Sequence, residues 1–243
     1  MEKKDQAVIS KKQTQQSLIL SLGGSLIYPK AGIDINFLRN LERFIRKHVE
    51  EGKKFFIVCG GGYISRKYQL AIKEVIGTIS HEDMDWLGIH ATRINAHLVR
   101  TILKDLADPQ VIDNYEKKYD LNDYKVIICS GWKPGWSTDY CATRLAFQYN
   151  AKLMINMSNV KMVYDKDPRQ FKDAKPIKSW NWGEYRKLAG NKWIPGMNLP
   201  FDPIASRLAS EIGLKVIILD GKNLLNLENC LEGKKFVGTT ITP

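Results

Sequence analysis

Short apolar runs along the chain alternate with longer segments in which apolar residues recur every three or four positions. Each short run is about five or six residues long, and most end at glycine, serine or another polar residue, which is the pattern of a buried strand. Runs of this kind lie at residues 17–22, 54–59, 125–129, 152–156 and 215–219, and a segment at 236–241 closes the chain.

The segments between these runs have the spacing of amphipathic helices. The clearest follows Asp34, a candidate N-cap, and its apolar residues from Ile35 to Val49 keep helical spacing until Gly52. Another follows Asp202, also a candidate N-cap, and stops at Gly213. Further helices are predicted at residues 63–76, about 83–106, about 139–149 and near 183–188, and the rest of 169–200, rich in tryptophan and proline, is expected to be irregular.

Strands that alternate with helices predict βαβ units and therefore an α/β fold. A mainly parallel sheet would lie between helices on both faces, as a three-layer αβα sandwich. No internal repeat or low-complexity linker interrupts residues 17–243, which are expected to form a single domain. Residues 1–16 are polar and rich in lysine and glutamine, so we expect a disordered tail or a leader outside the fold.

The charge balance points to anionic partners. The chain has 243 residues, 44% of them hydrophobic, and a formal net charge of +11. Such a balance suits nucleotides, nucleic acid or a membrane surface. The positive charge is dispersed, however, and no nucleic-acid motif accompanies it, so a generic basic surface is favoured over a dedicated nucleic-acid face.

Cysteine usage and apolar segments favour the cytoplasm. The four cysteines form no CxxC pair, and Cys59 and Cys129 end apolar runs, so we expect buried thiols rather than disulfides. The first 16 residues lack the apolar core of a signal peptide, and no run of about 18 apolar residues could span a bilayer. His48, His81, His90 and His97 are expected to be structural or exposed.

Two glycine clusters follow the first two predicted strands. We call Gly23-Gly24-Ser25 the first glycine turn and Gly60-Gly61-Gly62 the second glycine turn. Glycine lets backbone N–H groups approach a phosphate without a side chain in the way, and a helix N-terminus adds favourable charge. Arg66, one helical turn later, could bind the same phosphate, although an exposed basic helix face is the alternative. Neither a P-loop sequence nor a GxGxxG fingerprint is present.

The most unusual segment is the loop at residues 130–139, here called the tryptophan loop. Trp132 and Trp136 flank Lys133-Pro134-Gly135, and Ser137-Thr138-Asp139 follows. These side chains could hold a base and a phosphate; alternatively, the loop is a Pro-Gly turn whose tryptophans pack on the core. Because ligands bind at the carboxyl ends of parallel strands, the glycine turns, this loop and Ser158-Asn159 predict one composite site.

Taken together, these motifs resemble the uridylate (UMP) kinases of the amino acid kinase superfamily, and most closely their archaeal-type branch. The resemblance extends from about residue 18 to 242 in the family's order. It rests on the two glycine turns with Arg66, Asp85 with Leu87-Gly88, Pro134-Gly135 with Ser137-Thr138-Asp139, Ser158-Asn159-Val160 with Tyr164 and Asp167-Pro168, Asp202-Pro203, and Gly238-Thr239.

The resemblance implies the amino acid kinase fold, a homohexamer, and transfer of phosphate from ATP to UMP with Mg²⁺. It implies that Gly24, Ser25, Gly62 and Arg66 contact the phosphates, with Arg66 and Asp202 as catalytic residues, although Asp202 could equally be a plain helix cap. Ser158, Asn159, Tyr164 and Asp167 would hold adenine and ribose. UMP would lie against Gly61, Asp85, Trp132, Lys133, Pro134, Gly135, Trp136, Ser137 and Thr138. For Asp85, a helix cap is the alternative.

Two positions depart from the family's pattern. Ser21 stands where some members have a lysine, and Lys161-Met162 replaces the usual Asp-Gly. Lys161 or Lys133 could supply part of the missing charge. In-line phosphoryl transfer needs positioning and charge neutralisation and no general base, in keeping with a motif set that lacks catalytic dyads. The alternatives are a superfamily kinase for a carboxylate, carbamate or isopentenyl phosphate, or a non-catalytic oxyanion-storage or nucleic-acid-binding protein on this fold.

Overall fold

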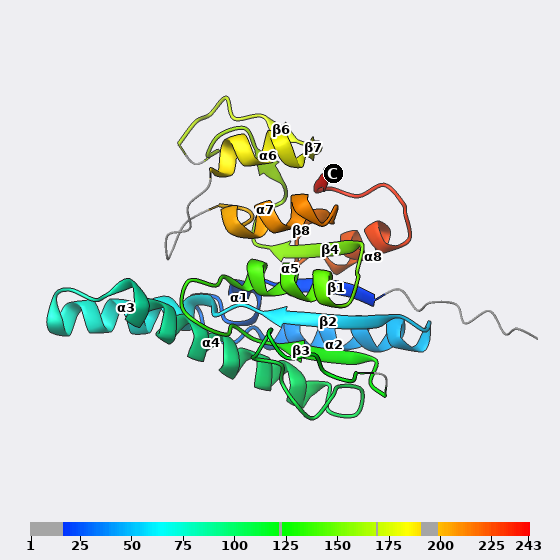
Figure 1. Ribbon diagram of the computed structural model, residues 1–243, viewed down its shortest axis with the longest axis horizontal. Helices are drawn as coiled ribbons and strands as arrows, with labels where there is room; N and C mark the ends of the chain where they lie inside the picture. The colour runs from blue at the N-terminus through cyan, green and yellow to red at the C-terminus, as the bar shows by residue number, and fades with distance from the viewer. Residues whose placement is uncertain (1–16, 122, 169, 191–198) are drawn as a thin grey trace, which may run out of the picture.

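A seven-stranded sheet forms the centre of the computed structural model, which describes residues 17–121, 123–168, 170–190 and 199–243 (Figure 1). The strand order is β3-β2-β1-β4-β8-β9-β7. The bounds are β1 Ser17–Leu22, β2 Lys54–Cys59, β3 Val126–Cys129, β4 Leu153–Ser158, β7 Ser179–Asn181, β8 Lys215–Asp220 and β9 Thr239–Thr242. A separate pair joins β5, Val163–Tyr164, to β6, Pro176–Ile177.

The sheet is mainly parallel, as predicted. Strands β3, β2, β1, β4 and β8 are parallel neighbours, β9 pairs antiparallel with β8, and β7 pairs parallel with β9. The register places Leu22 opposite Cys59 and Ser158 opposite Asp220. These parallel strands therefore finish at one common edge, where we expected a composite site.

Helices cover both faces of this sheet and complete the three-layer sandwich. The helices are α1 Gly24–Ile27, α2 Ile35–Glu50, α3 Gly62–Ile76, α4 His81–Ile102, α5 Thr138–Gln148, α6 Trp182–Ala189, α7 Pro203–Glu211 and α8 Leu224–Leu231. Alternate residues of each strand point to opposite faces. On one face Ile19 and Phe56 pack with α5, α6 and α7; on the other Leu20 and Phe55 pack with α1, α2, α4 and α8.

Local sequence signals account for most of these elements. Strands 17–22 and 54–59 have the predicted bounds, and Asp34 caps α2 by accepting a hydrogen bond from the Phe37 N–H (3.0 Å). Asp202 likewise caps α7 through the Ala205 N–H (2.7 Å). The thiols of Cys59 and Cys129 are free and buried, as expected.

Some elements differ from the prediction. The long helix is α4, which begins at His81 with Ser80 as N-cap and ends at Ile102 rather than near residue 106. The short helix α1 and the helix α8 were not predicted, and β6 and β7 lie in a region expected to be irregular. A four-residue helix and two- or three-residue strands are too short to show a period, so tertiary pairing decides them. Residues 1–16 and the segment 191–198 lie outside the described residues.

Candidate active site

The two glycine turns touch each other at the carboxyl ends of β1 and β2. The Gly60 N–H donates to the Leu22 carbonyl (2.9 Å), and the Gly23 N–H donates to the Met157 carbonyl at the end of β4 (2.9 Å). A Cβ on Gly24 would lie 2.1 Å from the Gly62 nitrogen, and Gly62 has φ +70°. Side chains are therefore excluded, and the contact is made by backbone alone, as a phosphate-binding surface requires.

A cavity of about 380 Å³ adjoins the end of β4. Four predicted nucleotide-binding residues, Ser158, Asn159, Tyr164 and Asp167, line it together. The remaining lining residues are Val160, Met162, Lys166, Pro168, Leu188, Leu199 and Pro200. A largely apolar cavity with a few polar groups at its edge suits a planar base and its sugar. Because Gly23 is bonded to Met157, the first glycine turn lies next to this cavity.

The tryptophan loop is held against α4. The carboxylate of Asp85 accepts a hydrogen bond from the Gly135 N–H (2.7 Å), and the Thr92 hydroxyl accepts one from the Gly131 N–H (2.7 Å). Gly135 has φ +81°, a conformation that glycine adopts readily. Ser80, not Asp85, caps α4, so the alternative that Asp85 is a helix cap is wrong. Asp85 instead connects the helix to the loop.

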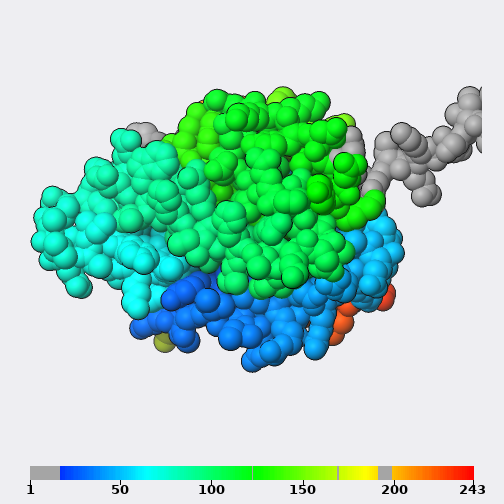
Figure 2. All heavy atoms as spheres, turned by 90° about the horizontal axis from the view of Figure 1, so that it is seen from below, coloured from blue at the N-terminus to red at the C-terminus, as the bar shows by residue number. Residues whose placement is uncertain are grey.

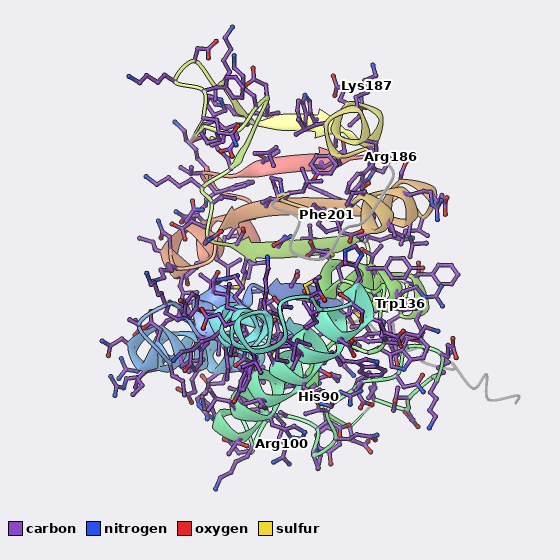
Figure 3. All side chains as sticks on the ribbon, turned by 90° about the vertical axis from the view of Figure 1, so that its left-hand side faces the viewer. His90, Arg100, Trp136, Arg186, Lys187 and Phe201 are labelled. Carbon is purple, nitrogen blue, oxygen red and sulfur yellow. The ribbon has the colours of Figure 1, made fainter. Side chains whose placement is uncertain are left out.

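The two tryptophans of this loop form an aromatic cluster with a lysine between them. The Trp132 and Trp136 rings meet edge to face with centroids 4.7 Å apart, and Trp136 meets Tyr140 at 4.5 Å. The Lys133 ammonium lies 4.0 Å from the Trp132 ring centroid and 3.1 Å from a Glu116 carboxylate oxygen. Both tryptophans also pack on the core, which was the structural alternative. Figure 3, viewed towards the carboxyl edge of the parallel strands, shows Trp136 at the side of this edge.

Asp139, which we did not assign as a site residue, lies close to Asp202, which the resemblance implies to be catalytic. Asp139 accepts hydrogen bonds from the Ser21 hydroxyl (3.0 Å) and the Asn156 amide (3.1 Å). The residue keeps some accessible surface, but protein surrounds its carboxyl group. Burial, followed by the negative charge of Asp202, raises the pKa of Asp139 to about 7. Burial also raises the pKa of Asp202.

This pair explains what Ser21 does in place of a lysine. A lysine there would put a cation beside Asp139, whereas the serine offers a neutral donor. Since Asp139 directly follows the recognised Ser137-Thr138 sequence, that motif was the available signal. Sequence spacing did not show it, because Ser21 and Asp139 are 118 positions apart.

The remaining predicted residues lie in the glycine turns or on exposed segments. Ser25 is in α1, and Gly61 is the N-cap residue of α3. Arg66 is exposed on α3, with its guanidinium carbon 5.6 Å from the Tyr63 ring centroid. Lys161 is exposed beyond β4. Within the described ranges, no group of three or more His, Cys, Asp or Glu side chains could hold a metal ion, and no helix there is long and apolar enough to cross a membrane.

Comparison with known proteins gives the same picture over nearly the whole chain. The model of the amino acid kinase family matches residues 16–220. A uridylate kinase of Methanococcus aeolicus is 31% identical over 230 residues, which cover 93% of this chain and 99% of the relative. One of Sulfurisphaera tokodaii is 34% identical over 229 residues, with the same shares of 93% and 99%.

Solved structures agree with these relatives. The crystal structure of uridylate kinase from Archaeoglobus fulgidus superposes with a TM-score of 0.77 at 28% identity, covering 92% of this chain and 99% of that one. UMP kinase from Bacillus anthracis superposes with a TM-score of 0.75 at 22% identity, covering 93% and 96%, which shows the common fold.

The contact between the glycine turns predicts a large steric effect of a single methyl group. Gly62→Ala would place a Cβ 2.3 Å from the Gly24 carbonyl oxygen, whereas Gly77, which also has positive φ, has open space around it. We expect Gly62→Ala to lower the free energy of unfolding by at least about 2 kcal/mol more than Gly77→Ala. Urea unfolding of both variants measures the difference, and equal losses would contradict the contact.

The raised pKa of Asp139 predicts a pH dependence of stability. The unfolded carboxyl loses its proton near pH 4, while the folded one keeps it until about pH 7. In that interval the native state binds the extra proton, so Asp139 makes stability fall as pH rises, by less than about 1.4 kcal/mol per pH unit. Asp139→Asn should remove this fall. Urea midpoints of both proteins between about pH 4 and 8 test it, and parallel curves would mean that Asp139 is ionised throughout.

Proposed function

The chain belongs to the amino acid kinase family, and from this premise we propose that it is a uridylate kinase, which transfers the γ-phosphoryl group of ATP to UMP. The observation that carries the proposal is the juxtaposition at the sheet edge. Two glycine turns lie in backbone contact, with the β4 cavity on one side and the tryptophan loop, held by Asp85, on the other. A donor and an acceptor nucleotide could thus meet end to end at the turns.

In the reaction, an oxygen of the UMP phosphate attacks the γ-phosphorus of ATP as the bond to the bridging oxygen of ADP breaks. UDP and ADP are the products. The chain's task is to align the two phosphates and to neutralise charge, so no general base is needed. When bound with ATP, Mg²⁺ supplies positive charge to the phosphate oxygens.

We assign the ligands to residues as follows. Gly24, Ser25, Gly62 and Arg66 contact the phosphates, and backbone N–H groups of the touching turns support this role. Adenine and ribose occupy the β4 cavity against Ser158, Asn159, Tyr164 and Asp167. UMP lies against Gly61, Asp85 and residues 132–138 of the tryptophan loop. Asp202, bonded to the α7 backbone and close enough to raise the pKa of Asp139, organises the site from beneath.

The cation that compensates for Ser21 is proposed to be Lys161 rather than Lys133. Lys133 is engaged by Glu116 and by the Trp132 ring, and both contacts hold it in the tryptophan loop. Lys161 lies between Val160 and Met162, which line the β4 cavity, and it is exposed. Its flexible side chain can therefore reach a phosphate at the mouth of that cavity.

We also propose a homo-oligomer in which α3 lies at a subunit interface. This helix forms one end of the molecule (Figure 2), and all of its residues are at least partly exposed. Four large apolar side chains of this helix are exposed: Tyr68, Leu70, Val75 and Ile76. Val75 is 82% exposed. A second copy of the chain would cover this apolar surface. The single domain at 17–243 and the cytoplasmic location stay predictions.

The activity itself is the first test. With ATP and Mg²⁺, the purified protein should release ADP in the presence of UMP, and release less with CMP. A coupled ADP assay should include glutamate, carbamate and isopentenyl phosphate as acceptors, since other superfamily kinases use a carboxylate, a carbamate or isopentenyl phosphate. A folded protein that releases ADP with one of these but not with UMP would overturn the proposal, and release with none would favour a non-catalytic role.

The role of Asp85 has a second test, in substrate preference. A carboxylate can accept hydrogen bonds from both ribose hydroxyls, so UMP should be preferred to dUMP. Asp85→Ala should lower kcat/KM for UMP by about 10- to 150-fold and narrow the UMP/dUMP ratio. Asp85→Asn keeps an oxygen that can accept from Gly135 N–H and is the matched control for loop anchoring. An Asp85→Ala enzyme with an unchanged UMP/dUMP ratio would remove Asp85 from the ribose site.

A further inference from the structure

One buried face of α4 holds the backbone of two loops that are far apart in the sequence. Thr92 and Asn95 are 5% and 2% exposed and lie one helical turn apart. Thr92 bonds the tryptophan loop through the Gly131 N–H (2.7 Å), and Asn95 bonds the second glycine turn. The helix thus contacts both the second glycine turn and the tryptophan loop.

The Asn95 amide makes two bonds to the second glycine turn. Its Nδ2 atom donates to the Gly60 carbonyl at 2.8 Å and to the Gly61 carbonyl at 3.1 Å. Both hydrogens of the amide group are thereby used, and both carbonyls are directed towards α4.

These bonds determine where the neighbouring N–H groups point. In a planar trans peptide, the N–H of the following residue is directed opposite to the C=O. With the Gly60 and Gly61 carbonyls turned towards α4, the N–H groups of Gly61 and Gly62 are turned away from it. The Gly62 nitrogen lies against the first glycine turn, since a Cβ on Gly24 would be 2.1 Å from it. A triple-glycine segment has little intrinsic preference among backbone conformations, so an external restraint is needed to hold both peptide planes.

We propose that Asn95 is a positioning residue for phosphoryl transfer: it orients the Gly61 and Gly62 N–H groups towards the transferring phosphate. Thr92 accepts a hydrogen bond from the Gly131 N–H and so holds the tryptophan loop, which positions the acceptor nucleotide. The inference rests on the proposed kinase function, and it assigns the positioning of the phosphate-binding turn and of the tryptophan loop to two side chains of a single helix. The Asn95 side chain is buried and its amide nitrogen is occupied by the two carbonyls, so we assign it a positioning role rather than a nucleotide contact.

A purely structural role for Asn95 makes a different prediction. If the amide only satisfies two buried carbonyls, its loss lowers stability and leaves the active folded enzyme with normal kinetics. Kinetic constants measured well below the melting temperature therefore separate the two roles. Hydrogen exchange of the unliganded protein adds a readout that needs no substrate.

The experiment compares Asn95→Leu, which has similar size and no donor, with Thr92→Val on the same helix face. Asn95→Leu should lower kcat about 10- to 100-fold, since small misplacements of reacting groups cost this much. It should also speed amide exchange in the peptide spanning 60–64 and not in that spanning 131–136. Thr92→Val should show the reverse pattern: faster exchange at 131–136 and a raised KM for UMP.

Asn95→Ala repeats the test if the leucine variant does not fold, because it removes both donors and adds neither bulk nor charge. A folded donor-free variant with kcat within threefold of the unaltered enzyme, or with unchanged exchange at 60–64, would overturn the proposal. Equal changes at both loops would also overturn it, since they would reflect general loosening. Failure of the unaltered protein to phosphorylate UMP would count against the proposed function, while the exchange comparison would still test the orientation of the turn.

Discussion

The site depends on the backbone contact between two glycine turns. Parallel pairing of β1 with β2 puts Leu22 opposite Cys59, so both strands end at the same level and their following turns must meet. A side chain on Gly24, Gly60 or Gly62 would collide with the backbone of the other turn. The cavity at β4 and the tryptophan loop after β3 are then placed by the same sheet, one strand outward on either side.

The electrostatics of the site depend on Asp139, which has only neutral hydrogen-bond donors as its side-chain partners among the described residues. Ser21 offers Asp139 a neutral hydrogen bond, and Asn156 offers a second. Two buried carboxyl groups near each other cannot both ionise cheaply, so the pair favours a proton on Asp139 near neutrality. In the proposed function, positive charge for the phosphates is assigned to Arg66 and Lys161, which are exposed. The chain's net charge of +11 is consistent with anionic ligands.

On the acceptor side, the tryptophan loop combines rigid rings with backbone anchors. Trp132 and Trp136 pack on the core and on each other, which limits the conformations of a loop that contains Gly135 in a positive-φ conformation. Asp85 and Thr92 then attach this loop to α4 through two backbone N–H groups. The structural and functional interpretations of the tryptophans are thus compatible, since packed rings can also order a ligand-binding loop.

The sequence by itself determined the longer strands, most of the longer helices and the motifs. Asp34 and Asp202 act within three residues of themselves, apolar spacing is a local property, and glycine clusters at strand ends are visible directly, so these features could be read without a structure. Only the tertiary structure decided that Ser21 meets Asp139, that Asn95 reaches Gly60 across 35 positions, and that Asp85 binds the tryptophan loop instead of capping its helix. The tertiary structure also decided the short elements, such as α1 and β7. The physical reason is that such contacts join side chains to distant backbone groups, and a hydrogen bond between positions far apart leaves no period or spacing in the chain.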